Sequence, residues 1–124
     1  MEFGEIICAL RAEKGIYQKE LADYLKVSIG TISNYEQGIH NPDFNTLCSI
    51  ADFYEVSLDY LLGRTNIRAS ADQLDQKLTD NYTVADLLNT TLQLDAASTH
   101  SLVEYINLLM LKQDKNSQAK KESN

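Results

Sequence analysis

The sequence is poor in the residues that are common in disulfide-bonded and metal-binding proteins. It has two cysteines, one proline and no tryptophan in 124 residues. Cys8 and Cys48 stand alone among apolar neighbours, without a CxxC pair or a Cys/His cluster, which excludes a disulfide framework and a zinc site. We expect both thiols to be reduced and buried in the core, because free cysteine behaves as a small apolar residue.

Long apolar runs are also missing. No stretch approaches the roughly 20 apolar residues that a membrane span needs. The first 15 residues, MEFGEIICALRAEKG, are acidic and amphipathic, unlike the basic and then apolar pattern of a signal peptide. These features predict a cytoplasmic protein. No paired carboxylates, Ser/His arrangement or metal cluster is visible, so we expect neither an enzyme nor a bound cofactor.

Basic residues are scarce as well. The net charge is −7, and the first 66 residues hold five basic and ten acidic side chains. This balance opposes nucleic-acid binding, which depends on Lys and Arg against phosphate. The acids are unevenly placed, however. None occurs from residue 25 to residue 35, and half of the ten follow that segment. We expect Lys14, Lys19 and Lys26 near the half that would face nucleic acid, so charge can be polarised within an acidic domain.

Apolar residues recur at spacings of three and four, so the sequence predicts an all-α fold. Five short helices are expected in the first 63 residues, and Ser28 and Ser57 suit N-caps of the third and fifth. The expected ranges are about 2–13, 18–25, 28–36, a fourth helix opened by Asn41-Pro42-Asp43, and a fifth closed by Gly63.

Changes in composition divide the chain into four segments. We predict a helical domain over 1–65, a linker or weak helix over 66–81, a C-terminal helical region over 82–112, and a polar, frayed tail over 113–124. The first five helices are enough to close a core of their own, since domains of about 55–65 residues can fold alone.

The most informative segment is QKELADYLKVSIGTISNYEQG, residues 18–38. It predicts a helix, a tight turn and a second helix, with the small Ala22 where the two helices approach. The outer face of the second helix is small and polar, which suits insertion into a major groove about 12 Å wide.

Over residues 2–63 the chain resembles the phage repressor/Cro helix-turn-helix family. The resemblance includes Gln18-x-Glu20-Leu21-Ala22, the run Thr31-Ile32-Ser33-Asn34-Tyr35-Glu36-x-Gly38, and Val56-Ser57-Leu58-Asp59-Tyr60-Leu61-Leu62-Gly63. Members of this family are standard examples of helix-turn-helix docking on DNA. The resemblance implies a five-helix repressor-like DNA-binding domain followed by C-terminal helices.

The resemblance also implies roles for single residues. Gln18 would touch a phosphate and brace the recognition helix, and Arg11 and Glu36 would form an internal ion pair. The implied DNA-binding residues are Gln18, Lys19, Ser28, Ile29, Gly30, Thr31, Ser33, Asn34 and Asn41. Three departures bear on binding. Tyr17 replaces the usual Ser or Thr cap, Lys26 replaces a turn glycine, and the loop 37–41 lacks the Arg and Lys of relatives.

The C-terminal region carries an apolar face that the first domain does not need. That face comprises Leu102, Val103, Ile106, Leu109 and Met110. It predicts a homodimer, which would match a pseudo-palindromic operator. Packing on the DNA-binding domain and binding of an antagonist protein are the alternatives.

The sequence therefore predicts a sequence-specific transcriptional regulator, a dimeric repressor that reads double-stranded operator DNA with helix 28–36. The alternative is a protein-interaction or antitoxin-like module in which DNA binding is secondary or lost. The acidic charge and the missing basic loop keep that alternative open.

Overall fold

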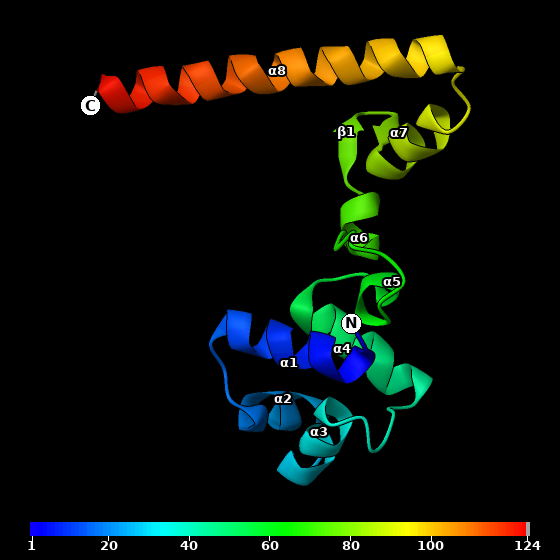
Figure 1. Cartoon of the computed structure of the whole chain (residues 1–124), viewed down its shortest axis with the longest axis vertical. Coiled ribbons are helices and arrows are strands. Elements are labelled where there is room, and N and C mark those ends of the chain that lie inside the picture. Colours follow the sequence, from blue (N-terminus) through cyan, green and yellow to red (C-terminus); the bar gives the residue numbers. More distant parts are fainter. Residues whose placement is uncertain (124) are drawn as a thin grey trace. The chain divides into compact units, whose positions relative to one another are not determined.

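The computed structural model describes residues 1–123 and divides them into two units, Met1–Gln76 and Lys77–Asn124, the last residue lying outside the description. Most of the described chain is helical (Figure 1). The elements in chain order are α1 (Phe3–Lys14), α2 (Gln18–Leu25), α3 (Ile29–Glu36), α4 (Phe44–Tyr54), α5 (Leu58–Leu61), α6 (Ala71–Leu74), β1 (Lys77–Thr79), β2 (Tyr82–Thr83), α7 (Val84–Thr91) and α8 (Ala96–Glu122).

The first unit contains the five predicted helices, packed around one apolar core. Their hydrophobic faces meet because each helix repeats apolar residues every three or four positions. Five large side chains are fully buried, namely Ile7, Leu21, Ile32, Ile50 and Leu61. Leu25 and Val27 are half-buried at the edge of this core. The core draws one residue or more from every helix of the five, so it fixes their mutual arrangement.

Side-chain caps begin α3, α4 and α5 as the sequence predicts. The Oγ of Ser28 accepts the N–H of Thr31 at 3.1 Å, and Asp43 and Ser57 cap the next two helices in the same way. Each cap satisfies an amide that the first helical turn leaves without a partner. The helix boundaries in this unit therefore follow from local sequence.

The two cysteines are not in the core, and that prediction is wrong. Cys8 and Cys48 are both exposed. Each follows a buried or half-buried residue in sequence, but neighbours along a helix point about 100° apart, so an apolar neighbour does not imply a shared face. The helical face that carries Cys8 turns away from Ile7 and Leu10, which are buried.

The segment after the first five helices is more structured than a linker. A short helix, α6, is followed by a two-stranded antiparallel hairpin in which Thr79 pairs with Tyr82. Asp80 and Asn81 form its two-residue turn, a position that favours short polar residues. The all-helical prediction missed this hairpin because its strands are too short to show alternation.

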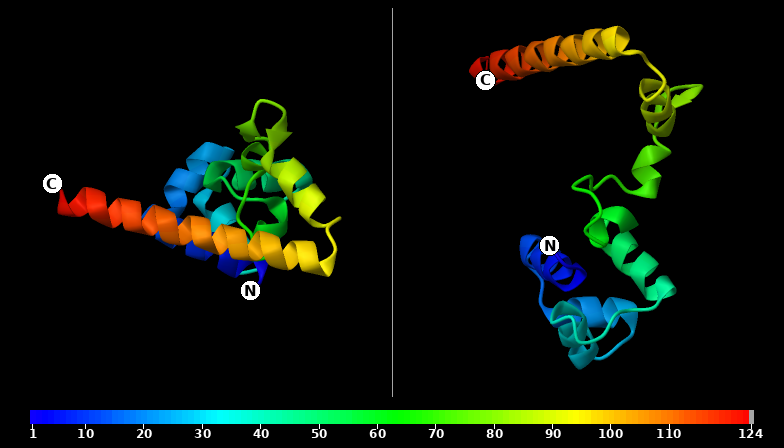
Figure 2. Two further views of the ribbon diagram at one scale, coloured as in Figure 1. Left: turned by 90° about the horizontal axis from the view of Figure 1, so that it is seen from above. Right: turned by 45° about the vertical axis from the view of Figure 1, so that its right-hand side comes forward.

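The polar tail is also helical, contrary to prediction. α8 begins at the N-cap Asp95 and continues for 27 residues to Glu122, without an interruption in either view of Figure 2. The segment after Lys112 has no glycine or proline and contains three Lys, two Gln, one Ala and one Glu, which favour helix. The polar composition had suggested a frayed tail, but the helix propensity of these residues determines the backbone conformation here.

Candidate nucleic-acid interface

The turn between α2 and α3 is tight and built from backbone bonds. Lys26 adopts the left-handed region at φ 59°, and the N–H of Val27 donates to the carbonyl of Ala22 at 3.0 Å. A residue other than glycine in this conformation costs some backbone strain. Ala22, only 1% exposed, lets α2 and α3 cross closely. The result is a rigid helix, turn and helix, seen in the lower part of Figure 1.

One face of α3 is buried and the other is open. Ile32 and Tyr35 point into the core, whereas Ile29 is 49% exposed and Gly30 is open to solvent. A Cβ added at Gly30 would find its nearest neighbour, the Ser28 Oγ, at 3.8 Å. The outer surface of α3 is thus small at its first turn, which permits close approach of another molecule.

The polar side chains on this helix differ in whether they already make hydrogen bonds within the protein. The Ser28 Oγ lies 2.9 Å from the Thr31 Oγ1, and the Ser33 Oγ accepts the Nε2 of Gln37 at 2.8 Å. Within residues 1–123 the Asn34 side chain makes no hydrogen bond, nor do those of Lys19 and Asn41. Asn34 therefore offers both its donor and its acceptor to a ligand.

A hydrogen-bonded ion pair fixes the end of α3 to α1. The Nε of Arg11 lies 2.6 Å from Glu36 Oε1, and its Nη2 donates to Oε2 at 3.3 Å. The side chains are 18% and 8% exposed. The hydrogen bond from Arg11 to Glu36 raises the pKa of the guanidinium above its ordinary value. The structure thus brings together the two residues that the resemblance paired.

Gln18 joins the same cluster. Its Nε2 donates to Glu36 Oε2 at 2.8 Å, so the carboxylate holds the first residue of α2 as well as α1. The Nη1 of Arg11 donates to the carbonyl of Ile16 at 2.9 Å and secures the loop before α2. One carboxylate therefore locks α1, α2 and α3 together, which orients the recognition helix. The second hydrogen on the Gln18 nitrogen is available to an external acceptor.

Tyr54 lies beside this cluster with its hydroxyl buried. Burial raises the pKa of Tyr54 to about 12, and its Oη makes no hydrogen bond within the described residues. Its ring packs edge-on against Phe53 at 4.9 Å between centroids. A neutral phenol here fills the space between α4 and the charged pair.

Lys14 is not available on the α3 side, which corrects an expectation. Its Nζ donates to the carbonyl of Phe53 at 3.1 Å and lies 4.2 Å from the centre of the Phe53 ring. It caps the end of α4, since a cation near a helix C-terminus satisfies carbonyls that lack partners. Lys19 and Lys26 remain as exposed cations close to the helix-turn-helix.

Sequence reasoning missed one residue that positions the site. Gly4 is buried, and a Cβ built on it would lie 2.4 Å from the carbonyl oxygen of Glu36 and 2.6 Å from that of Tyr35. Only glycine allows α1 to approach the last turn of α3 this closely. A glycine inside an amphipathic helix was the available signal.

Other kinds of site find no support in the part of the chain that the structure describes. Residues 1–123 contain no group of three or more His, Cys, Asp or Glu side chains that could hold a metal ion. Over the same residues, no helix has the length and apolar character to cross a membrane.

Comparison with known proteins agrees with this geometry. The helix-turn-helix family matches residues 9–61. The HTH-type transcriptional regulator YqaE of Bacillus subtilis, described as uncharacterized, is 35% identical over 82 residues, which cover 65% of this chain and 71% of that protein. The chain belongs to the helix-turn-helix family of transcriptional regulators.

Three further proteins show how far the similarity extends along the chain. The HTH-type transcriptional regulator ImmR of Bacillus subtilis is 37% identical over 92 residues, which span 74% of this chain but only 63% of that protein. The P22 c2 repressor, solved with synthetic operator 9T, superposes with a TM-score of 0.50 and 31% identity over 52% of this chain and 98% of that one. A transcriptional regulator from Listeria innocua shares the fold at 19% identity, with a TM-score of 0.51.

Proposed function

We propose that the protein is a sequence-specific, DNA-binding transcriptional repressor that places α3 in the major groove of its operator. The open, small and polar face of α3 carries the proposal, because a helix with this surface on a rigid partner can reach base edges. The relationship to the P22 c2 repressor, whose structure contains operator DNA, supports it. A DNA-binding regulator of this kind acts in the cytoplasm.

Residues of the interface divide into two roles under this proposal. Asn34, Thr31 and Ile29 face base edges, while the close approach needed for reading is possible at Gly30. Neutral donors hold the DNA backbone, namely Gln18, Ser28 and Asn41, with Lys19 and Ser33 beside them. We propose further that the protein acts as a homodimer through the face of Leu102, Val103, Ile106, Leu109 and Met110.

Substitution of Asn34 by alanine should relax sequence preference. Asn34 has no intramolecular hydrogen bond to lose within the described residues, so the change removes a base contact and leaves the fold intact. We expect a loss of about 1–3 kcal/mol on the preferred sequence and little change on others. Titration of labelled duplexes, one with the preferred sequence and one with an unrelated sequence, measures the effect.

Gln18→Ala is the matched variant for a backbone contact. It should weaken all sequences alike, because a phosphate contact carries no sequence information. Because Gln18 also donates a hydrogen bond to Glu36, the free energy of unfolding of the Gln18→Ala variant in urea must be measured alongside its DNA affinity. If Asn34→Ala instead weakened every sequence equally, Asn34 would not be a base-reading residue.

The salt dependence of binding should be shallow. Lys14 is engaged with Phe53, which leaves Lys19 and Lys26 as the exposed cations near α3. Two neutralised phosphates give a slope of log K against log salt of about −2 for each bound copy. Lys19→Gln should reduce the slope by about 0.9. A slope several times steeper, measured by anisotropy from low to high salt, would reveal a basic surface elsewhere.

A protein-interaction module remains the second candidate function. The acidic charge of −7 favours it, because such a charge slows encounter with DNA. Selection of DNA from a random library separates this candidate from the repressor, because only the repressor recovers a preferred sequence.

A further inference from the structure

The middle of α8 is apolar on nearly every side and is covered by nothing in the described unit. Seven of the eight apolar residues from Leu102 to Leu111 are 45–62% exposed, and Leu102 is half-buried. At 100° per residue, they leave an arc of about 220° without a polar side chain, running from Leu108 round to Val103. A surface helix of a globular protein usually has a stripe of only about 100°. This segment needs a partner.

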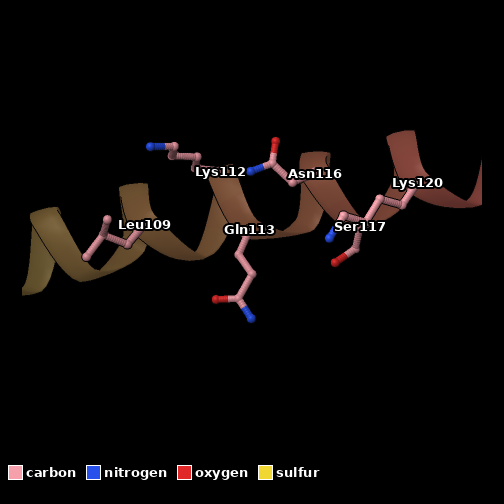
Figure 3. A pocket seen from close by; sticks show the side chains of 6 residues that line it. All are labelled: Leu109, Lys112, Gln113, Asn116, Ser117 and Lys120. Atoms are coloured by element: carbon pink, nitrogen blue, oxygen red, sulfur yellow. The ribbon is translucent and has the colours of Figure 1, made fainter. Parts of the chain in front are cut away.

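The two ends of α8 carry opposite charges. Asp95 caps the N-terminus, where its carboxylate accepts the N–H of Ser98 at 2.8 Å. Near the C-terminus, Lys120 projects from the side of the helix that holds Ile106 and Leu109, by its position in the helical repeat. Beyond Leu111 the helix is polar, with Lys112 and Asn116 on one side of it and Gln113 on the other (Figure 3). The apolar contact surface is therefore short and is bracketed by an acid and a base.

We infer that a second copy of this chain covers the stripe with its own α8, running antiparallel. With a two-fold axis between Asn107 and Leu108, Ile106 of one copy faces Leu109 of the other, and Asp95 faces Lys120. The same arrangement repeats on the other side of the axis, as an isologous interface requires. A parallel pair would align the same apolar residues but would set Lys120 against Lys120 and Asp95 against Asp95. Charge complementarity selects the antiparallel pair.

The arc is wider than one neighbouring helix can cover. α7 supplies a second apolar surface, because Leu88 and Leu92 are 51% and 84% exposed. We therefore expect the α7 helices to complete the cover of each α8. The inference rests on the proposed dimer and names its orientation. It does not depend on DNA binding.

Disulfide cross-linking between introduced cysteines tests the orientation. The background is the full chain with Cys8→Ser and Cys48→Ser, two exposed positions where the change leaves the core untouched. Thr99→Cys and Ser117→Cys lie on the stripe side at nearly the same distance from the two-fold axis, differing by one position, or about 1.5 Å along the helix. In the antiparallel pair, each of these residues lies roughly 25–30 Å from the same residue of the second copy. Thr99 of one copy instead faces Ser117 of the other. A disulfide needs Cβ atoms about 4 Å apart.

The expected result is a cross-link only when the Thr99→Cys and Ser117→Cys chains, made in two sizes, are mixed and oxidised. Lys115→Cys, on the opposite side of α8, is the control and should not link to Thr99→Cys. Efficient linking of either variant with itself would overturn the antiparallel orientation in favour of a parallel one. A chain that sediments as a monomer at micromolar concentration would overturn the second copy as the occupant. Neither result would touch the proposed DNA contacts of α3.

Discussion

Replacing Arg11 with methionine should cost roughly 3 kcal/mol or more of unfolding free energy. The change leaves the Glu36 carboxylate, 8% exposed, without its charged partner, and a buried charge stripped of its partner typically costs 3–5 kcal/mol. Because Arg11 also donates to the Ile16 carbonyl, the loop before α2 loses a bond as well. Urea denaturation followed by circular dichroism measures the loss.

An exposed ion pair in the same unit provides the control. Arg68 and Glu13 lie 2.9 Å apart but are 50% and 58% exposed, so Glu13→Gln should change stability far less than Arg11→Met does. Glu36→Gln should fall near Arg11→Met, since it leaves the buried guanidinium unpaired. If Arg11→Met were as mild as Glu13→Gln, the cluster would not be what orients α3.

Gly4→Ala should destabilise the first unit by about 3 kcal/mol. Its Cβ would meet two backbone carbonyls at 2.4 and 2.6 Å, and neither can move without shifting the last turn of α3. Overpacking of this kind usually costs 1–3 kcal/mol, and contact with backbone puts it at the upper end. Thermal or urea unfolding of the variant measures the cost.

Gly30→Ala is the matched glycine variant. An added Cβ there has 3.8 Å of clearance within the protein, and alanine is the better helix former by up to about 1 kcal/mol. The variant should therefore be as stable as the parent or slightly more so, yet bind the preferred DNA less well, because the methyl group stands at the proposed groove contact. Equal loss of stability in the two glycine variants would contradict the packing described for Gly4.

Local signals in the sequence predict the first unit well. The caps Ser28, Asp43 and Ser57 and the apolar spacing fix where the helices lie, because both act within a few residues. The pairing of Arg11 with Glu36 is different. It joins residues 25 apart in sequence, and the resemblance to known repressors suggested it where local pattern could not.

Contacts between distant elements account for what the sequence did not predict. Lys14 was expected near the DNA side, but the carbonyl of Phe53 at the end of α4 binds it. Gly4 gave no sign of its two carbonyl neighbours, because they belong to α3. α8 exceeded its predicted end for another reason: polarity was taken as a sign of fraying, although the residues after Lys112 favour helix.

The measurement that tests the proposed function most directly is selection of DNA by the full-length protein from a random library, followed by titration of the selected sequence and a scrambled one. A sequence-specific repressor should bind the selected sequence at least about 1,000-fold more tightly than the scrambled duplex at physiological salt. Asn34→Ala should remove a large part of that ratio. Recovery of no preferred sequence, with equal affinity for both duplexes, would rule out the repressor and favour the protein-interaction module.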